Sequence, residues 1–277
     1  MALENRLLAR SNETGISLDR LRRRVVFERV VARLQAAEPG RWVIKGGMAL
    51  EMRLGDEARL TKDLDLGLRD DVRSAAELHE RLIEALMADP DGDGFVLGAG
   101  VPKELPLDSA GHLTWRVKVS AALAGKLFGG LRIDVSPRVH ELDATDQVTL
   151  PNSLAFAGIT TPTAEVIDVH RHAAEKFHAM LRAYGDRENS RVRDLVDLVI
   201  LVEHDLLNPN ALRIAVDQVW RERDATGSPT AIPPLPDSWP IRYEQLATDH
   251  DLQTLSFADA VALINRLWAA TQRSSSG

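Results

Sequence analysis

Two aspartates one residue apart carry the clearest chemical signal in this sequence. Asp63 and Asp65 belong to DLDLGL, residues 63–68, where apolar and polar residues alternate strictly, so we expect a half-buried strand. Residues two apart on a strand point the same way, which places both carboxylates on the polar face, about 7 Å apart. Like charges repel and Asp is a poor strand former, so a divalent cation such as Mg²⁺ would explain the pair. The alternative is a solvated edge strand whose acids keep the chain soluble.

A third carboxylate, Asp134, lies on the polar side of LRIDVSP, residues 131–137, another alternating run. If this strand neighbours the first one, Asp134 joins the aspartate pair as a metal ligand. Three acids on adjacent strands would hold one or two metal ions of the kind that clamps a phosphoryl transfer. The alternative is an ion pair between Asp134 and Arg116 or Arg132.

A double glycine, Gly46 and Gly47, lies between a short strand over residues 42–44 and a short helix over residues 48–54. Glycines at such a junction let backbone amides approach a phosphate, and the helix N-terminus favours negative charge. The stretch is neither a P-loop nor a dinucleotide-binding fingerprint. The informative feature is the order: strand, double glycine, short helix, then a strand that bears D-x-D.

This order carries a family resemblance. The run KGGMALEMR…ARLTKDLDL resembles the first motif of the nucleotidyltransferase superfamily, and within it the AbiEii/AbiGii-type toxins of type IV toxin–antitoxin systems. The chain is also similar to the mycobacterial MenT toxins. The family's R-x-[ST]-x-D-x-D run is here Arg59-Leu60-Thr61-Lys62-Asp63-Leu64-Asp65. Later motifs match Lys176 in AAEKFHAML, and Arg193, Asp194, Asp197 and Leu198 in RVRDLVDL. The match spans residues 40–205, and its departures are a threonine at position 61, where serine is commoner in the family, and an acidic, glycine-rich loop at 89–100.

The resemblance implies roles for individual residues. It implies catalytic roles for Asp63, Asp65, Lys176 and Asp194, with Mg²⁺ or Mn²⁺ as cofactor and a nucleoside triphosphate as substrate. Nucleotide contacts are expected from Lys45, Gly46, Gly47, Arg59, Thr61, Lys62 and Lys176. Thr61 is also a candidate for regulatory phosphorylation: if the strand begins that early, its hydroxyl lies near the acids, and a phosphate there would compete with the substrate for metal. The alternative is that Thr61 merely suits a strand start.

Lys176 and the two later aspartates also have ordinary explanations. Lys176 lies beside an apolar helix face, where it either neutralises triphosphate charge or extends to water. Asp194 and Asp197 lie three apart on one side of a helix, and the alternative to a functional Asp194 is a solvated face paired with Arg191 or Arg193.

A basic cluster surrounds Lys176. It either tracks an RNA backbone or forms a helix pair laced with salt bridges. Its members are Arg171, Lys176, Arg182, Arg187, Arg191 and Arg193, joined by His170, His172 and His178.

The elements around these motifs favour a mixed α/β (α+β) fold. We expect a nucleotidyltransferase-like core over residues 1–158, with a small mixed sheet and flanking helices that include 16–37 and 74–88. A helical C-terminal region, 159–277, would pack on this core. There we expect helix over 163–204, with a break near YGDRENS, a helix opened by Pro209 and a last helix over 257–270, while the proline-rich TGSPTAIPPLPDSWP is irregular.

Composition excludes several classes of protein. The 277 residues can bury a sizeable core, and 44% hydrophobic and 27% charged residues are typical of a soluble protein. The absence of cysteine excludes disulfides and thiolate metal sites. The charged N-terminus and the lack of a long apolar run favour a cytoplasmic location with no membrane contact. A net charge of -7 argues against a protein that binds nucleic acid with its whole surface.

The expected reaction transfers a nucleoside monophosphate from a nucleoside triphosphate to RNA. The resemblance implies the 3′ end of tRNA as acceptor, which would block aminoacylation and translation, and a cognate antitoxin encoded nearby as partner of a monomeric toxin. Two alternatives stay open: a nucleotidyltransferase that modifies a small molecule such as an antibiotic, and a non-catalytic nucleotide-binding module.

Overall fold

The computed structural model describes residues 2–58, 61, 63–107, 112–138, 142, 144–186, 188–224, 227–249 and 255–273. The chain forms two compact units. The first unit comprises Met1–Arg53 and Thr61–Val166, and the second comprises Leu54–Leu60 and Ile167–Gly277. The division into domains after residue 158 stays a prediction.

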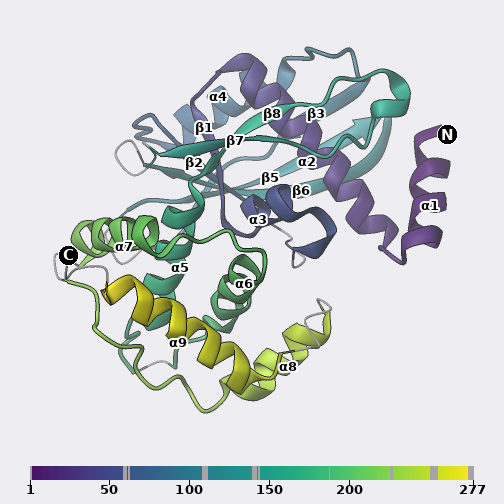
Figure 1. Ribbon diagram of the computed structural model, residues 1–277. Coiled ribbons are helices and arrows are strands. Elements are labelled where there is room, and N and C mark those ends of the chain that lie inside the picture. The colour runs from purple at the N-terminus through teal and green to yellow at the C-terminus, as the bar shows by residue number, and fades with distance from the viewer. Residues whose placement is uncertain are drawn as a thin grey trace. The chain divides into compact units, whose positions relative to one another are not determined.

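One mixed sheet organises the first unit (Figure 1). Its strands run in the order β3-β5-β6-β2-β1-β8-β7, with β4 paired to β5. The pairs β1–β8 and β2–β6 are parallel, whereas β1–β2, β3–β5, β4–β5 and β5–β6 are antiparallel. The bounds are β1 Trp42–Lys45, β2 Asp63–Leu68, β3 Phe95–Ala99, β4 Lys103–Glu104, β5 Trp115–Leu123, β6 Lys126–Pro137, β7 Thr145–Thr149 and β8 Thr163–Ile167. The predicted mixed α/β fold is confirmed.

Alternating side chains give the central strands one apolar and one polar face. The apolar side chains of β2, β5 and β6 are buried: Leu64, Leu66, Leu68, Val117, Val119, Ile133 and Val135. Helix α2, Leu18–Ala37, packs against β6, and α4, Ala75–Met87, packs against β3 and α2. Helix α1, Ala2–Thr14, lies against α2. Burial of apolar side chains between these helices and the sheet stabilises the unit and leaves the polar side chains of β2 and β6 outside the core.

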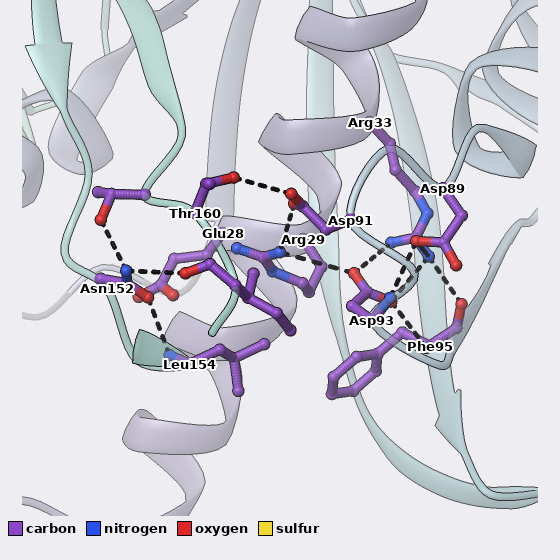
Figure 2. Close-up of polar contacts among 12 residues, drawn as sticks. Glu28, Arg29, Arg33, Asp89, Asp91, Asp93, Phe95, Asn152, Leu154 and Thr160 are labelled. Atoms are coloured by element: carbon purple, nitrogen blue, oxygen red, sulfur yellow. Dashed lines mark hydrogen bonds and ion pairs between the residues drawn. The ribbon is translucent and has the colours of Figure 1, made fainter. Parts of the chain in front are cut away.

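The acidic loop between α4 and β3 is tied to α2 by two buried arginines (Figure 2). Arg29 Nη1 donates to Asp91 Oδ2 at 3.0 Å, and the Arg33 guanidinium donates to both carboxylate oxygens of Asp93, each at 3.0 Å. Arg33 also donates to the Phe95 carbonyl at 2.8 Å. Buried charges need such partners, because removal from water is costly. The acids of this loop therefore hold it against α2.

Glu28, which precedes Arg29 on α2, is buried as well (Figure 2). Its carboxylate accepts hydrogen bonds from the Ser153 backbone amide at 3.0 Å and from the Ser153 hydroxyl at 2.6 Å. Burial raises the pKa of Glu28 to about 7, although these hydrogen bonds lower it. This contact between α2 and the segment before β8 therefore changes its charge near neutral pH.

The second unit is helical around an aromatic core. Its helices are α5 Val169–Leu181, α6 Val192–Glu203, α7 Pro209–Arg223, α8 Trp239–Asp249 and α9 Phe257–Arg273. Trp268 on α9 contacts Phe177 on α5 and Trp220 on α7, with ring centroids 4.8 and 5.8 Å away. The Trp268 indole N–H donates to the Pro229 carbonyl at 3.1 Å, which fixes the proline-rich segment to this core.

Three expectations about secondary structure need correction. Residues 163–167 are the strand β8 rather than helix, because Val166 pairs with Ile44 of β1 in the parallel ladder. Helix α3, Gly46–Leu54, begins at the double glycine itself. Residues 239–240, expected to be irregular, open α8.

Among the helices of the described residues, none has the length and apolar character that a membrane span requires.

Candidate active site

Strand register brings the three predicted acids together on one face of the sheet. Asp65 of β2 lies opposite Asp134 of β6, and on its other side it lies opposite Lys45 of β1. Arg116 of β5 lies opposite Asp134, which completes a row of four charged residues across four strands. A second row runs parallel to the first: Asp63, Arg132 and Lys118. Paired residues on neighbouring strands point to the same face, and we call this the carboxylate face.

Two of the acids are held by arginines. Arg116 Nε and Nη2 donate to the two Asp134 oxygens at 2.8 and 2.7 Å. Arg132 Nε and Nη2 donate to Asp63 at 2.7 and 3.0 Å. Hydrogen bonding to Asp134 raises the pKa of Arg116 above its ordinary value, and the charges of Asp63 and Asp65 add to this effect. Of the two partners considered for Asp134, Arg116 forms the ion pair, and Arg132 pairs with Asp63 instead.

Gly46 closes over the third acid. Its backbone has φ +61°, and a Cβ built on it would lie 1.8 Å from Asp65 Oδ2. Only glycine fits there, because any side chain would displace the carboxylate and strain the left-handed backbone. The Asp65 carboxylate therefore lies against the first residue of α3, where Gly47 follows and Lys45 precedes. The first glycine of the pair thus lies beside the second aspartate of D-x-D.

The donor set of the carboxylate face fits a hard divalent ion, because carboxylate oxygens are the protein ligands that Mg²⁺ prefers. Among the described residues, however, no three His, Cys, Asp or Glu side chains are arranged to hold a metal. Two of the three predicted ligands, Asp63 and Asp134, are instead bonded to guanidinium groups. Metal ligation by Asp63, Asp65 and Asp134 stays a prediction.

The predicted nucleotide-binding residues before β2 are described only in part. Arg59 and Lys62 lie outside the described residues. Thr61 is described, and its hydroxyl donates to the Asp63 carbonyl at 3.4 Å. Because β2 begins at Asp63, the strand does not reach back to Thr61, and alternation does not place the Thr61 hydroxyl on the carboxylate face. The role of Thr61 stays a prediction.

In the second unit, Lys176 of α5 meets both aspartates of α6. Lys176 Nζ donates to Asp197 Oδ2 at 2.5 Å and to Asp194 Oδ1 at 3.1 Å. Lys176 is 6% exposed, Asp194 8% and Asp197 0%. The aspartates therefore do not form a solvated face, and Lys176 does not extend to water. Arg191, an expected partner of this pair, lies more distant, with Nη1 3.8 Å from Asp194 Oδ2.

The basic cluster near Lys176 is largely engaged within the second unit. Arg171 donates to Glu175 at 3.2 Å and to Glu222 at 3.0 and 2.5 Å. His178 lies 2.9 Å from Asp224, and burial lowers the pKa of His178. These contacts favour the alternative of salt-bridged helices over an RNA-tracking surface. One predicted member, Arg187, lies outside the described residues.

Sequence reasoning missed Arg132 as the partner of Asp63 and the joint contact of Lys176 with both α6 aspartates. The first pair depends on register: the alternation of β6 puts Arg132 on the same face as Asp134, but only the pairing with β2 shows which acid it meets. The second contact joins buried side chains of opposite charge on two helices, whereas the spacing of Asp194 and Asp197 in the sequence shows only that they share one side of α6.

Comparison with known proteins identifies the family of this chain and similar folds. A search of curated protein sequences found no significant match. Among solved structures, the chain is similar to MenT4, a nucleotidyltransferase toxin from Mycobacterium tuberculosis H37Rv, with 20% identity, a TM-score of 0.55, and coverage of 98% of this chain and 95% of that one. It also matches JHP933 from Helicobacter pylori, with 17% identity, a TM-score of 0.47 and 91% of each chain covered. The family model described as nucleotidyl transferase AbiEii toxin, type IV TA system, matches residues 29–274, and the chain therefore belongs to the AbiEii nucleotidyltransferase toxin family.

Proposed function

We propose that this toxin transfers a nucleoside monophosphate from a nucleoside triphosphate to the 3′ end of tRNA in the cytoplasm. Beyond the family itself, the observation that supports the proposal is the carboxylate face. Asp63 and Asp65 share one side of β2, Asp134 lies in register with Asp65, and the backbone of Gly46 lies against the Asp65 carboxylate. Acids converging beside a helix N-terminus suit a reaction on phosphates.

Asp63 and Asp65, with Asp134 beside them, would hold Mg²⁺. When bound, the ion supplies a Lewis acid that offsets charge on the triphosphate. In this proposal the amides of Gly46 and Gly47, together with Lys45 opposite Asp65, bind phosphate oxygens. Arg116 and Arg132 fix the orientation of Asp134 and Asp63 and reduce the repulsion among the acids.

The chemical step joins the acceptor to the α-phosphate. The 3′-hydroxyl oxygen of the RNA attacks the α-phosphorus, the bond to the β-phosphate oxygen breaks, and pyrophosphate leaves. The hydroxyl proton passes to a base. The catalytic roles of Asp194 and Lys176, which the second unit carries, stay predictions. A tRNA with an extended 3′ end cannot be aminoacylated, so translation stops, and a cognate antitoxin is needed to restrain the enzyme.

The test uses the purified full chain, bulk tRNA, Mg²⁺ and each α-labelled nucleoside triphosphate in turn. We expect label in the tRNA 3′ end, and none with Asp65→Asn, which removes a half-buried carboxylate without removing core volume. The matched control is Asp71→Asn, an exposed acid just beyond β2 whose side chain is 71% exposed, and it should keep activity. Label that enters a small molecule rather than RNA, or full activity in Asp65→Asn, contradicts the proposal.

A further inference from the structure

A groove of about 830 Å³ lies in the first unit, next to the carboxylate face. Residues of α2, β3, β5 and β6 contribute to its lining. Arg132 belongs both to this lining and to the ion pair with Asp63, so the groove and the predicted catalytic acids share a wall. An acceptor that lies in the groove is therefore close to Asp63.

The floor of the groove is made of residues with little or no side chain. Gly98 of β3, Ser120 of β5 and Gly130 of β6 lie opposite one another in register. A Cβ at Gly130 would lie 2.6 Å from the Val119 carbonyl oxygen, and one at Gly98 would lie 3.3 Å from Ser120 Oγ. Larger residues would fill this floor or force the strands to shift, so the open floor depends on these residue types.

The charges around this floor have one sign. Of the residues that the structure describes, the charged ones in the lining are Arg23, Lys118 and Arg132, and none of these is an acid. Lys118 lies opposite Arg132 in the ladder, so two cations stand side by side on neighbouring strands. This is a local positive surface on a chain whose net charge is -7. Such a surface attracts a polyanion.

We propose that this groove binds the sugar-phosphate backbone of the RNA acceptor, an inference that rests on the proposed function. None of the described residues that line the groove is aromatic, so these residues offer no platform for stacked bases. Cations and exposed backbone recognise phosphates and sugars without reading sequence. The groove therefore holds the acceptor strand in place while the reactive end lies at the carboxylate face.

The test measures the binding of fluorescently labelled bulk tRNA by fluorescence anisotropy. The assay contains no nucleotide or metal and is repeated at several KCl concentrations. We expect Lys118→Glu and Ser120→Glu to weaken binding by about tenfold or more at 0.1 M salt, since they place negative charge in the groove. Lys118→Ala should reduce the slope of log K against log[salt] by about 1.

The matched control is Lys126→Glu. Lys126 is exposed on the same β5–β6 hairpin, but it lies outside the groove lining. Its neighbour Leu127 lines the groove, and successive strand residues point to opposite faces. The control therefore makes the same change in net charge on the other face, and it should bind tRNA nearly as the wild type does.

Equal loss in Lys118→Glu and Lys126→Glu, or no loss in Lys118→Glu and Ser120→Glu, overturns the proposal. The variants should keep wild-type melting temperatures and wild-type affinity for a non-hydrolysable nucleotide, because both altered residues are exposed. Binding does not depend on catalysis, so the two proposals fail separately. A chain that binds tRNA through the groove but transfers no nucleotide contradicts only the proposed function. A chain that labels tRNA regardless of Lys118→Glu and Ser120→Glu contradicts only the groove.

Discussion

Replacement of Lys176 by methionine should destabilise the protein strongly. The change removes the ammonium that contacts Asp194 at 3.1 Å and Asp197 at 2.5 Å, and it leaves two carboxylates that are 8% and 0% exposed. Removing one partner of a buried ion pair costs about 3–5 kcal/mol, because the remaining charge stays out of water. With an m-value of about 2 kcal/mol/M, the midpoint of urea unfolding should fall by about 2 M. Circular dichroism and tryptophan fluorescence measure that midpoint.

The control is Lys103→Met, an exposed lysine of β4, which should change stability by no more than about 0.5 kcal/mol. A triple variant, Lys176→Met with Asp194→Asn and Asp197→Asn, removes all three charges and should recover much of the lost stability. If this stable triple variant regains nucleotidyl transfer, Lys176 serves the fold alone and its predicted catalytic role is wrong. If Lys176→Met is no less stable than Lys103→Met, the reasoning about the buried contact is refuted.

Three further predictions concern the first unit. Gly46→Ala should abolish transfer and lower the melting temperature more than Gly15→Ala does. Alanine at either position has a left-handed backbone, which costs about 1–2 kcal/mol, but only the Cβ at position 46 collides with Asp65. Folding raises the pKa of Glu28 from 4.5 to about 7, so the folded state binds this proton more tightly than the unfolded state does. This difference contributes about 3 kcal/mol to the free energy of unfolding below about pH 4.5, and the contribution is lost as pH rises to 7. Urea unfolding should therefore show the stability of Glu28→Gln relative to wild type increasing between pH 5 and pH 8, and a constant difference contradicts the shifted pKa. Thr61→Glu should silence transfer by mimicking a phosphate near Asp63, while Thr61→Val stays active, and an antitoxin that neutralises the toxin without adding phosphate mass excludes this switch.

Local pattern predicted the elements of the sheet that carry the candidate site. Strict alternation placed a strand over residues 63–68 and another around Asp134, and both lie where expected, because period two is a property of the strand itself. The same reasoning failed at residues 163–167. There the strand forms because Val166 pairs with Ile44, which is far away in the sequence. The local pattern of these five residues does not predict a strand.

The contacts of the acids depended on information that single strands do not contain. Alternation showed that Asp63 and Asp65 share a face, but which cation meets which acid follows from the register of β2 against β6 and of β6 against β5. Likewise, the three-residue spacing of Asp194 and Asp197 established a common helix side, yet only packing of α6 against α5 shows that this side is buried. Sequence thus indicated the candidate residues, and tertiary pairing determined their partners.

The arginines change what the aspartate pair implies. Two adjacent carboxylates on a strand suggested that a cation must offset their repulsion, and Mg²⁺ was the expected one. On the carboxylate face, Asp63, Asp65 and Asp134 are accompanied in register by four cations, which are Lys45, Arg116, Lys118 and Arg132. The four positive charges exceed the three negative ones, so the fold of the first unit does not require a metal to hold the acids together. A metal at this face would bind beside these cations, and Arg116 and Arg132 would continue to orient Asp134 and Asp63.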